Sequence, residues 1–206
     1  QTAETIGKGQ IEAGGNTSLF VTNTIDEDKN STAFAPEMFL RYGITDNFDI
    51  GFKTFPSIVP ILLPPHFFPE FKLRLFRIGE RNNYSFAASL IAGGGGSFGF
   101  VHTVEAWGGL VFSGQLSEKI EWYLSPRYAY IGLVTSKSDS DDPDQENSMM
   151  VTDGYFSPAI LGTFGVAIKF SDEIKLLPEV SYGRFFKSNN YSELSHYYLF
   201  VPSLGL

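Results

Sequence analysis

The sequence predicts an all-β fold, a transmembrane antiparallel up-and-down β-barrel of about ten strands. Apolar and polar residues alternate with a period of two along most of the 206 residues, and this pattern is typical of strands with one apolar and one polar face. Short and long connections between these segments also alternate along the chain. The apolar face is rich in aromatic residues, whereas the polar face carries nearly balanced charges.

Composition excludes several classes of protein. The chain has no Cys, which excludes a disulfide scaffold and any metal or thiol site built on Cys. Its formal net charge is −8, whereas nucleic-acid binding needs a basic surface, so we expect no nucleic-acid partner. The longest apolar run without charge, residues 55–69, contains five Pro in 15 residues and is therefore not a membrane-spanning helix. The length suits a single domain over residues 1–206.

Each predicted strand is defined by its alternation. Phe71, Lys72 and Leu73, for example, place an apolar, a charged and an apolar side chain in turn, so that opposite faces of the strand differ in polarity. The predicted strands cover residues 9–22, 33–44, 48–56, 70–78, 84–92, 98–113, 120–133, 155–170, 174–186 and 195–206.

The connections between these strands are of two kinds. Four are short and turn-like, at residues 45–47, 79–83, 115–119 and 171–173. Five are longer or unusual in composition, at residues 23–32, 55–69, 93–97, 135–154 and 187–194. Strict alternation of the two kinds is expected of an up-and-down meander, and it places both ends of the chain on the side of the short turns.

The apolar face is predicted to point outward into lipid. It carries sixteen aromatic residues, among them Phe52, Tyr84 and Trp122, which is a large volume for a small barrel to enclose. A transmembrane barrel turns its apolar face to the acyl chains and keeps a polar interior. Ten residues of tilted strand rise about 23 Å, close to the roughly 25 Å apolar band of such barrels.

The polar face is predicted to line the interior. Small residues such as Ser85 and Gly165 share this face with seven acidic and six basic residues. Because the charges nearly balance, we expect them to pair across a narrow, closed lumen, with an open pore as the alternative. The predicted lumen-facing charged residues are Glu12, Glu37, Arg41, Asp49, Lys53, Glu70, Lys72, Arg74, Glu105, Glu121, Arg127, Lys175 and Glu179.

Proline residues occur inside several predicted strands, always on the outward face. They are Pro36, Pro126, Pro158, Pro178 and Pro202. Because Pro lacks an amide hydrogen, each one leaves a carbonyl of a neighbouring strand without its ladder donor. We therefore expect most of them near the rims of the apolar band, or beside bulges.

The turn sequences carry a family resemblance. The segment Tyr42–Phe52, YGITDNFDIGF, resembles a periplasmic turn of Gram-negative outer-membrane β-barrel proteins, and Ser113–Leu124 and Ile168–Gly183 repeat the theme. The last segment, Tyr198–Leu206, is similar to the C-terminal strand of this class, although it ends in Leu rather than an aromatic residue. The resemblance implies a location in the bacterial outer membrane with both termini periplasmic, contact with lipid including lipopolysaccharide, and no activity.

The Pro-rich loop 55–69 is the candidate contact site. Its apolar residues would be an aggregation hazard in water, so we expect them to contact lipid or another outer-membrane or surface protein; packing against other loops is the alternative. The predicted contact residues are Ile58, Val59, Ile61, Leu62, Leu63, Phe67 and Phe68.

Catalytic and metal sites are not expected. His66, His102 and His196 fall on or near the long-loop side, but they form no Ser–His–acid set with a family spacing. The acidic loop Lys137–Asn147 lacks the spacing of a calcium loop, and weak divalent binding among lipopolysaccharide phosphates is the alternative to a solvated loop. We expect no cofactor.

These features predict a non-enzymatic structural or interaction subunit that presents extracellular loops. Three alternatives stay open at this point. They are a porin-like narrow channel for small solutes, a rim enzyme acting on lipid or peptide, and a secreted soluble lipocalin-like barrel with its apolar face inward.

Overall fold

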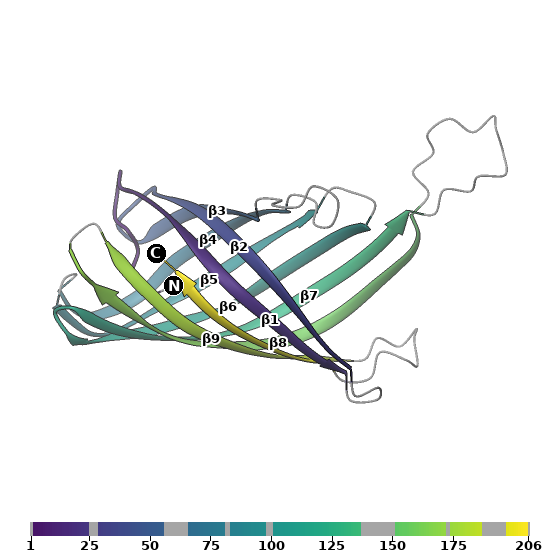
Figure 1. Ribbon diagram of the computed structural model, residues 1–206. Coiled ribbons are helices and arrows are strands. Elements are labelled where there is room, and N and C mark those ends of the chain that lie inside the picture. The colour runs from purple at the N-terminus through teal and green to yellow at the C-terminus, as the bar shows by residue number, and fades with distance from the viewer. Residues whose placement is uncertain are drawn as a thin grey trace.

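In the computed structural model, ten antiparallel strands close into a single barrel, in which every strand pairs with its neighbours in sequence and β1 pairs with β10 (Figure 1). The backbone is described for residues 2–24, 29–55, 66–80, 83–97, 101–136, 151–171, 174–186 and 197–205. Side chains are described for residues 2–19, 36–54, 67–80, 83–96, 104–130, 157–171, 174–184 and 186. Within these residues, no helix is long and apolar enough to span a membrane.

The predicted ten-stranded, up-and-down barrel is confirmed. The strands are β1 (Ile11–Thr24), β2 (Lys29–Gly43), β3 (Phe48–Phe55), β4 (His66–Glu80), β5 (Asn83–Ser97), β6 (Val101–Ser117), β7 (Ile120–Ser136), β8 (Val151–Lys169), β9 (Lys175–Phe185) and β10 (Tyr197–Gly205). The short turns gather at one end of the barrel, at the left of Figure 1, together with the start of β1 and the end of β10. We call this the short-turn end.

Several strands extend beyond their predicted limits at the opposite end. Residues 93–97 were expected to form a connection, but they belong to β5, where Gly93 pairs with Trp107 of β6. The run of four glycines has no side chains that could alternate, so its pairing through the backbone left no periodic signal. β4 likewise begins at His66, inside the predicted loop.

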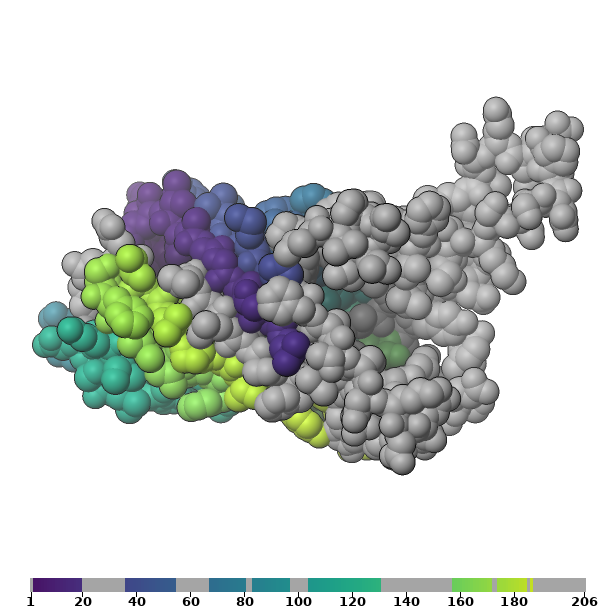
Figure 2. All heavy atoms as spheres, viewed as in Figure 1, coloured from purple at the N-terminus to yellow at the C-terminus, as the bar shows by residue number. Residues whose placement is uncertain are grey.

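The side chains have the polarity of a membrane barrel. Outward residues such as Tyr128 and Phe164 are 55% and 50% exposed, whereas the charged residues Asp49, Lys72 and Glu121 are 1%, 4% and 3% exposed. Figure 2 shows this outer surface, with described side chains of β1 and β9 on the face in view. A soluble barrel has the opposite polarity, so this arrangement argues against the lipocalin-like alternative.

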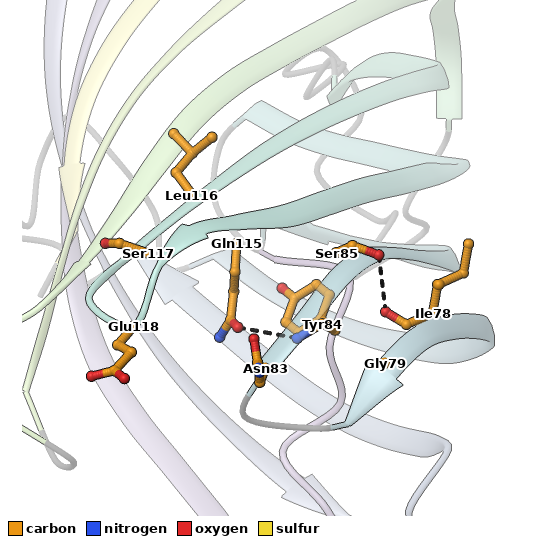
Figure 3. Close-up of a pocket in the computed structure, with 9 residues that line it drawn as sticks. All are labelled: Ile78, Gly79, Asn83, Tyr84, Ser85, Gln115, Leu116, Ser117 and Glu118. Carbon is orange, nitrogen blue, oxygen red and sulfur yellow. Dashed lines mark hydrogen bonds between the residues drawn. The ribbon is translucent and has the colours of Figure 1, made fainter.

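A β-bulge corrects the prediction at the start of β5. Ile78 pairs with Phe86 and Gly79 with Tyr84, so Ser85 is skipped and the side chains before it change face. Tyr84, predicted to point outward, is 2% exposed and lies inside the barrel. Ser85, predicted to point inward, is exposed and donates to the carbonyl of Ile78 at 3.3 Å (Figure 3).

Pro126 interrupts a ladder away from the rim of the barrel. Between β6 and β7 the pairing breaks between Gly109↔Arg127 and Phe112↔Leu124, beside Pro126. Pro126 lies well inside β7, which contradicts the expectation of a rim position for this residue. The hydroxyl of Ser125 donates instead to the carbonyl of Leu110 at 3.1 Å, and Leu110 lies opposite Pro126 in this register. The side chain thus replaces the missing amide donor.

Candidate functional site in the barrel interior

The interior has two unlike walls, and the first is dense in charge. We call the inward side chains of β1–β4 the charged wall. Its members are Glu12, Glu37, Arg41, Asp49, Lys53, Glu70, Lys72, Arg74 and Arg77, and all of them are buried or half-buried. Eight of these residues belong to the predicted lumen-facing set, and Arg77 is an addition from the structure.

Arg41 is the centre of the charged wall. Its Nη1 lies 2.9 Å from Oε2 of Glu12, and its Nε lies 3.1 Å from Oε1 of Glu70. Gly51 makes room for this cluster, because a Cβ there would lie 2.9 Å from Cγ of Glu70 and 3.0 Å from Cγ of Arg41. Long charged side chains therefore fit inside a narrow barrel where a neighbouring strand position is small.

Two lysines extend the charged wall on either side of Arg41. Nζ of Lys53 lies 3.5 Å from Oε1 of Glu37 and 3.4 Å from Oε2 of Glu70. Nζ of Lys72 lies 3.6 Å from Oδ2 of Asp49. Acids and bases thus face each other in turn along the wall, so each buried charge has a compensating partner.

The opposite side of the interior consists mainly of small side chains. We call the small, buried residues of β5–β8 that have the inward parity the small-residue wall. They are Ala87, Ser89, Ser113, Ser125, Ala129, Ala159, Thr163, Gly165 and Ala167. Tyr123 fills part of the space beside them. A Cβ at Gly165 would lie 2.3 Å from its ring, and its hydroxyl donates to Glu179 at 2.6 Å.

The remaining predicted lumen residues lie on β6, β7 and β9, and the structure places all five on the inward face. Glu121 is buried, and Glu105 and Lys175 are half-buried. The guanidinium of Arg127 donates from Nε to Oγ of Ser125 at 3.0 Å and lies 4.9 Å above the ring of Trp107. These charges are more widely dispersed than those of the charged wall.

A segment that precedes β1 lies between the two walls. Residues 2–7, here called the inner segment, belong to none of the ten strands and fold back from β1 into the barrel. Figure 1 marks the start of the chain inside the barrel outline, toward the short-turn end. The reversal uses Gly7 and Gly9, whose φ angles are +95° and +75°, a conformation that side chains other than glycine rarely adopt.

Ala3 joins the inner segment to the small-residue wall. Its amide donates to Oγ of Ser113 at 3.0 Å, and its carbonyl accepts a hydrogen bond from the hydroxyl of Ser89. Its side chain is fully buried and packs in a cluster with Tyr84 and Tyr123, among other residues. The seat for this residue is therefore partly apolar and partly polar.

The charged wall holds the other side of the inner segment. Lys72 donates from Nζ to the carbonyl of Glu4 at 2.5 Å, and Asp49 accepts from the amide of Ile6 at 3.0 Å. Oε2 of Glu4 lies 2.9 Å from Nη1 of Arg74 and 3.1 Å from Nη1 of Arg77. The inner segment thus connects the two walls and occupies the space between them.

The sequence pattern did not reveal the inner segment. Residues 2–7 show no apolar alternation, and the spacing of Gly7 and Gly9 around Lys8 is the one local signal of a reversal. The role of Glu4 depends on Arg74 and Arg77, which are about seventy residues away in the chain, so no local pattern could find it.

The predicted contact loop is only partly within the described residues. Ile58, Val59, Ile61, Leu62 and Leu63 lie outside them. Phe67 and Phe68, predicted to lie in the loop, belong to β4. Phe67 points outward, with its ring 5.5 Å from that of Phe52, whereas Phe68 is 7% exposed and points inward.

The candidate catalytic and metal-binding residues lie largely beyond the described side chains. The backbones of His66 and His102 lie in β4 and β6, while His196 and the acidic loop Lys137–Asn147 lie outside the described residues. Where side chains are described, His, Asp and Glu form no group of three or more that could hold a metal ion.

Comparison with known proteins gives matches in structure alone. No protein-family model matches the chain, and no curated protein matches it. Neisserial surface protein A is 10% identical with a TM-score of 0.44, over 95% of this chain and 96% of its own. The outer membrane protease OmpT from Escherichia coli is 14% identical with a TM-score of 0.46, over 95% and 93%. OprG from Pseudomonas aeruginosa is 10% identical with a TM-score of 0.38, over 100% and 95%.

These matches are to outer-membrane β-barrels of Gram-negative bacteria, the class that the turn sequences resemble. At such low identities the likeness concerns the fold alone.

Proposed function

We propose that this chain is an integral β-barrel protein of the bacterial outer membrane. One observation carries the proposal, namely that large apolar side chains are exposed around the outside while ionised side chains are enclosed, those of the charged wall in ion pairs. In water this polarity would leave the apolar surface hydrated and the buried charges desolvated. In a bilayer the same outer surface contacts acyl chains.

We further propose that the barrel works as a non-enzymatic structural or interaction subunit, closed in this state. The paired charges and the inner segment between the walls support a closed interior. Loops at the end opposite the short turns would then be the part available for contact, with lipopolysaccharide and with another outer-membrane or surface protein through residues 55–69. Both ends of the chain would be periplasmic, because short turns face the periplasm in barrels of this class.

The proposal is tested by making one substitution at two exposed isoleucines. Ile160 lies in the middle of β8 on the outer wall and is 54% exposed, and Ile44 lies in a short turn and is 40% exposed. In a membrane, Ile160→Arg should destabilise the barrel by about 2–4 kcal/mol, whereas Ile44→Arg, near the interface, should cost about 0–1 kcal/mol. Urea unfolding in lipid vesicles, followed by heat-modifiable migration on gels, measures both.

Equal effects of the two substitutions, or a wild-type chain that stays soluble and folded without detergent, would overturn the proposal. Both substitutions are exposed in the free protein, so a soluble barrel has no reason to distinguish them.

A narrow channel for small solutes is the second candidate. It is favoured by the small-residue wall, which leaves space between the strands that the inner segment fills. Conductance in planar bilayers separates the two candidates, since a closed structural subunit passes no ions and a channel does.

A further inference from the structure

We propose that the inner segment, residues 2–7, is a displaceable plug and that its release opens a path for small anions through the barrel. This inference rests on the membrane-spanning barrel proposed above and identifies the gate and the solute class of the channel alternative. It follows from the way the segment is held, from the way the chain reverses beside it, and from the charges that it neutralises.

The segment is held by separate polar contacts instead of by strand pairing. Side chains of the two walls supply these hydrogen bonds. Ser89 and Ser113 bind the backbone of Ala3, and Lys72 donates to the carbonyls of Thr2 and Glu4. Water can replace each of these bonds when the segment leaves, whereas a segment within the β-ladder would expose a whole row of backbone groups. The backbone N–H and C=O groups of the strands beside the segment pair with those of neighbouring strands, so they need no hydrogen bonds from the segment.

The end of β2 has a glycine where the inner segment passes close to the strand. A Cβ at Gly43, the last residue of β2, would lie 1.8 Å from the carbonyl oxygen of Gly7. The amide of Gly9 donates to the carbonyl of Gly43 at 2.7 Å. A methyl group at position 43 and the inner segment therefore cannot both occupy their present places.

Release of the segment changes the charge of the short-turn end. Glu4 pairs with both Arg74 and Arg77, so its departure leaves two guanidiniums without this carboxylate beside the opened lumen. Asp46, whose carboxylate accepts a hydrogen bond from the amide of Lys8, lines a pocket together with Arg74 and Arg77. Deeper in, Lys72 faces Asp49 and Arg41 faces Glu12 and Glu70, so those groups remain paired. The mouth becomes net positive, which favours anions.

The first test removes the plug. A chain lacking residues 2–8 and the full chain are inserted into planar bilayers of phosphatidylcholine in potassium chloride. We expect the deletion to raise the conductance at least about tenfold, since the closed state depends on several charge-assisted hydrogen bonds. We also expect a reversal potential, measured in a salt gradient, that shows preference for chloride. Heat-modifiable migration shows whether each chain is folded.

Point variants test the same gate without deletion. Glu4→Gln removes the negative charge that pairs with Arg74 and Arg77, and Gly43→Ala places a methyl group where Gly7 now lies. Each substitution should displace the inner segment and raise the conductance of the full chain. Lys8→Gln is the matched control, since Lys8 belongs to the same N-terminal stretch and its side chain is exposed. Arg74→Gln with Arg77→Gln in the shortened chain should shift the preference away from chloride.

A covalent lock completes the design. The chain has no Cys, so a disulfide between Ala3→Cys and Ser113→Cys is unambiguous, and oxidation should hold the barrel closed until a reductant is added.

The proposal is overturned if the shortened chain is folded and inserted, yet conducts no more than the full chain. A cation-preferring path would contradict the solute class. A chain that neither inserts nor shows heat-modifiable migration would contradict the membrane proposal instead, so the two failures are distinguishable.

Discussion

The charged wall and the small-residue wall line the same interior but fill it in opposite ways. On β1–β4, long side chains reach inward and compensate one another, as Arg41 does with Glu12 and Glu70. On β5–β8, alanines, serines and glycines leave room that Tyr123 and the inner segment occupy. The comparison teaches that a closed barrel need not be filled evenly. Long side chains on one wall can fill the interior, while small side chains on the other leave room for a separate segment.

The largest expected effect is in the charged wall. Arg41→Met should destabilise the folded barrel by about 3–5 kcal/mol, because it leaves Glu12 without its ion-pair partner and Glu70 with Lys53 alone. Lys119→Met, at an exposed position in a short turn, is the matched control and should change stability little. Urea unfolding in detergent micelles measures both. A loss below about 1 kcal/mol for Arg41→Met would show that water already reaches the cluster.

The small-residue wall should respond to added volume instead of lost charge. Gly165→Val should cost about 1–3 kcal/mol, because its Cβ would lie 2.3 Å from Cζ and from the hydroxyl oxygen of Tyr123. Gly162→Val is the control, since no atom lies within 4 Å of a Cβ there. Adding Tyr123→Ala to Gly165→Val should recover part of the loss, and purely additive effects in this double-mutant cycle would contradict the contact.

The smallest effect concerns the hydroxyl that replaces the donor missing at Pro126. Ser125→Ala should cost about 1–2 kcal/mol, because the carbonyl of Leu110 then lacks a donor. Ser85→Ala, at an exposed hydroxyl on the outer surface, should cost less. If the two variants have the same unfolding midpoint, the side chain does not compensate for the proline.

Alternation predicts most of the fold, because it reports directly which face of a strand is apolar. It identifies the ten strands and the inward parity of charged residues such as Asp49 and Lys72. It fails at Tyr84, where a bulge changes the face within a strand, and a bulge adds one residue without altering composition. It also fails for Gly93, whose pairing involves the backbone alone.

The candidate site is predictable only where it belongs to strands. The thirteen inward charges follow from parity, but the pairing among them depends on register between strands, which one sequence does not specify. The inner segment could not be predicted, because its contacts from Ala3 to Ser89 and Ser113 join residues that are 86 and 110 positions apart in the chain. The two-walled interior is therefore a property of the closed barrel that no single segment contains.

The inside-out polarity is tested most directly by the chain's own two tryptophans. Trp122 lies on the outer wall beside Phe86, and Trp107 lies inside beneath Arg127. Trp107→Phe and Trp122→Phe each leave one reporter, whose fluorescence is measured in vesicles with brominated acyl chains. The account predicts strong quenching of Trp122 and little quenching of Trp107. Equal quenching of both, or quenching of Trp107 alone, would contradict it.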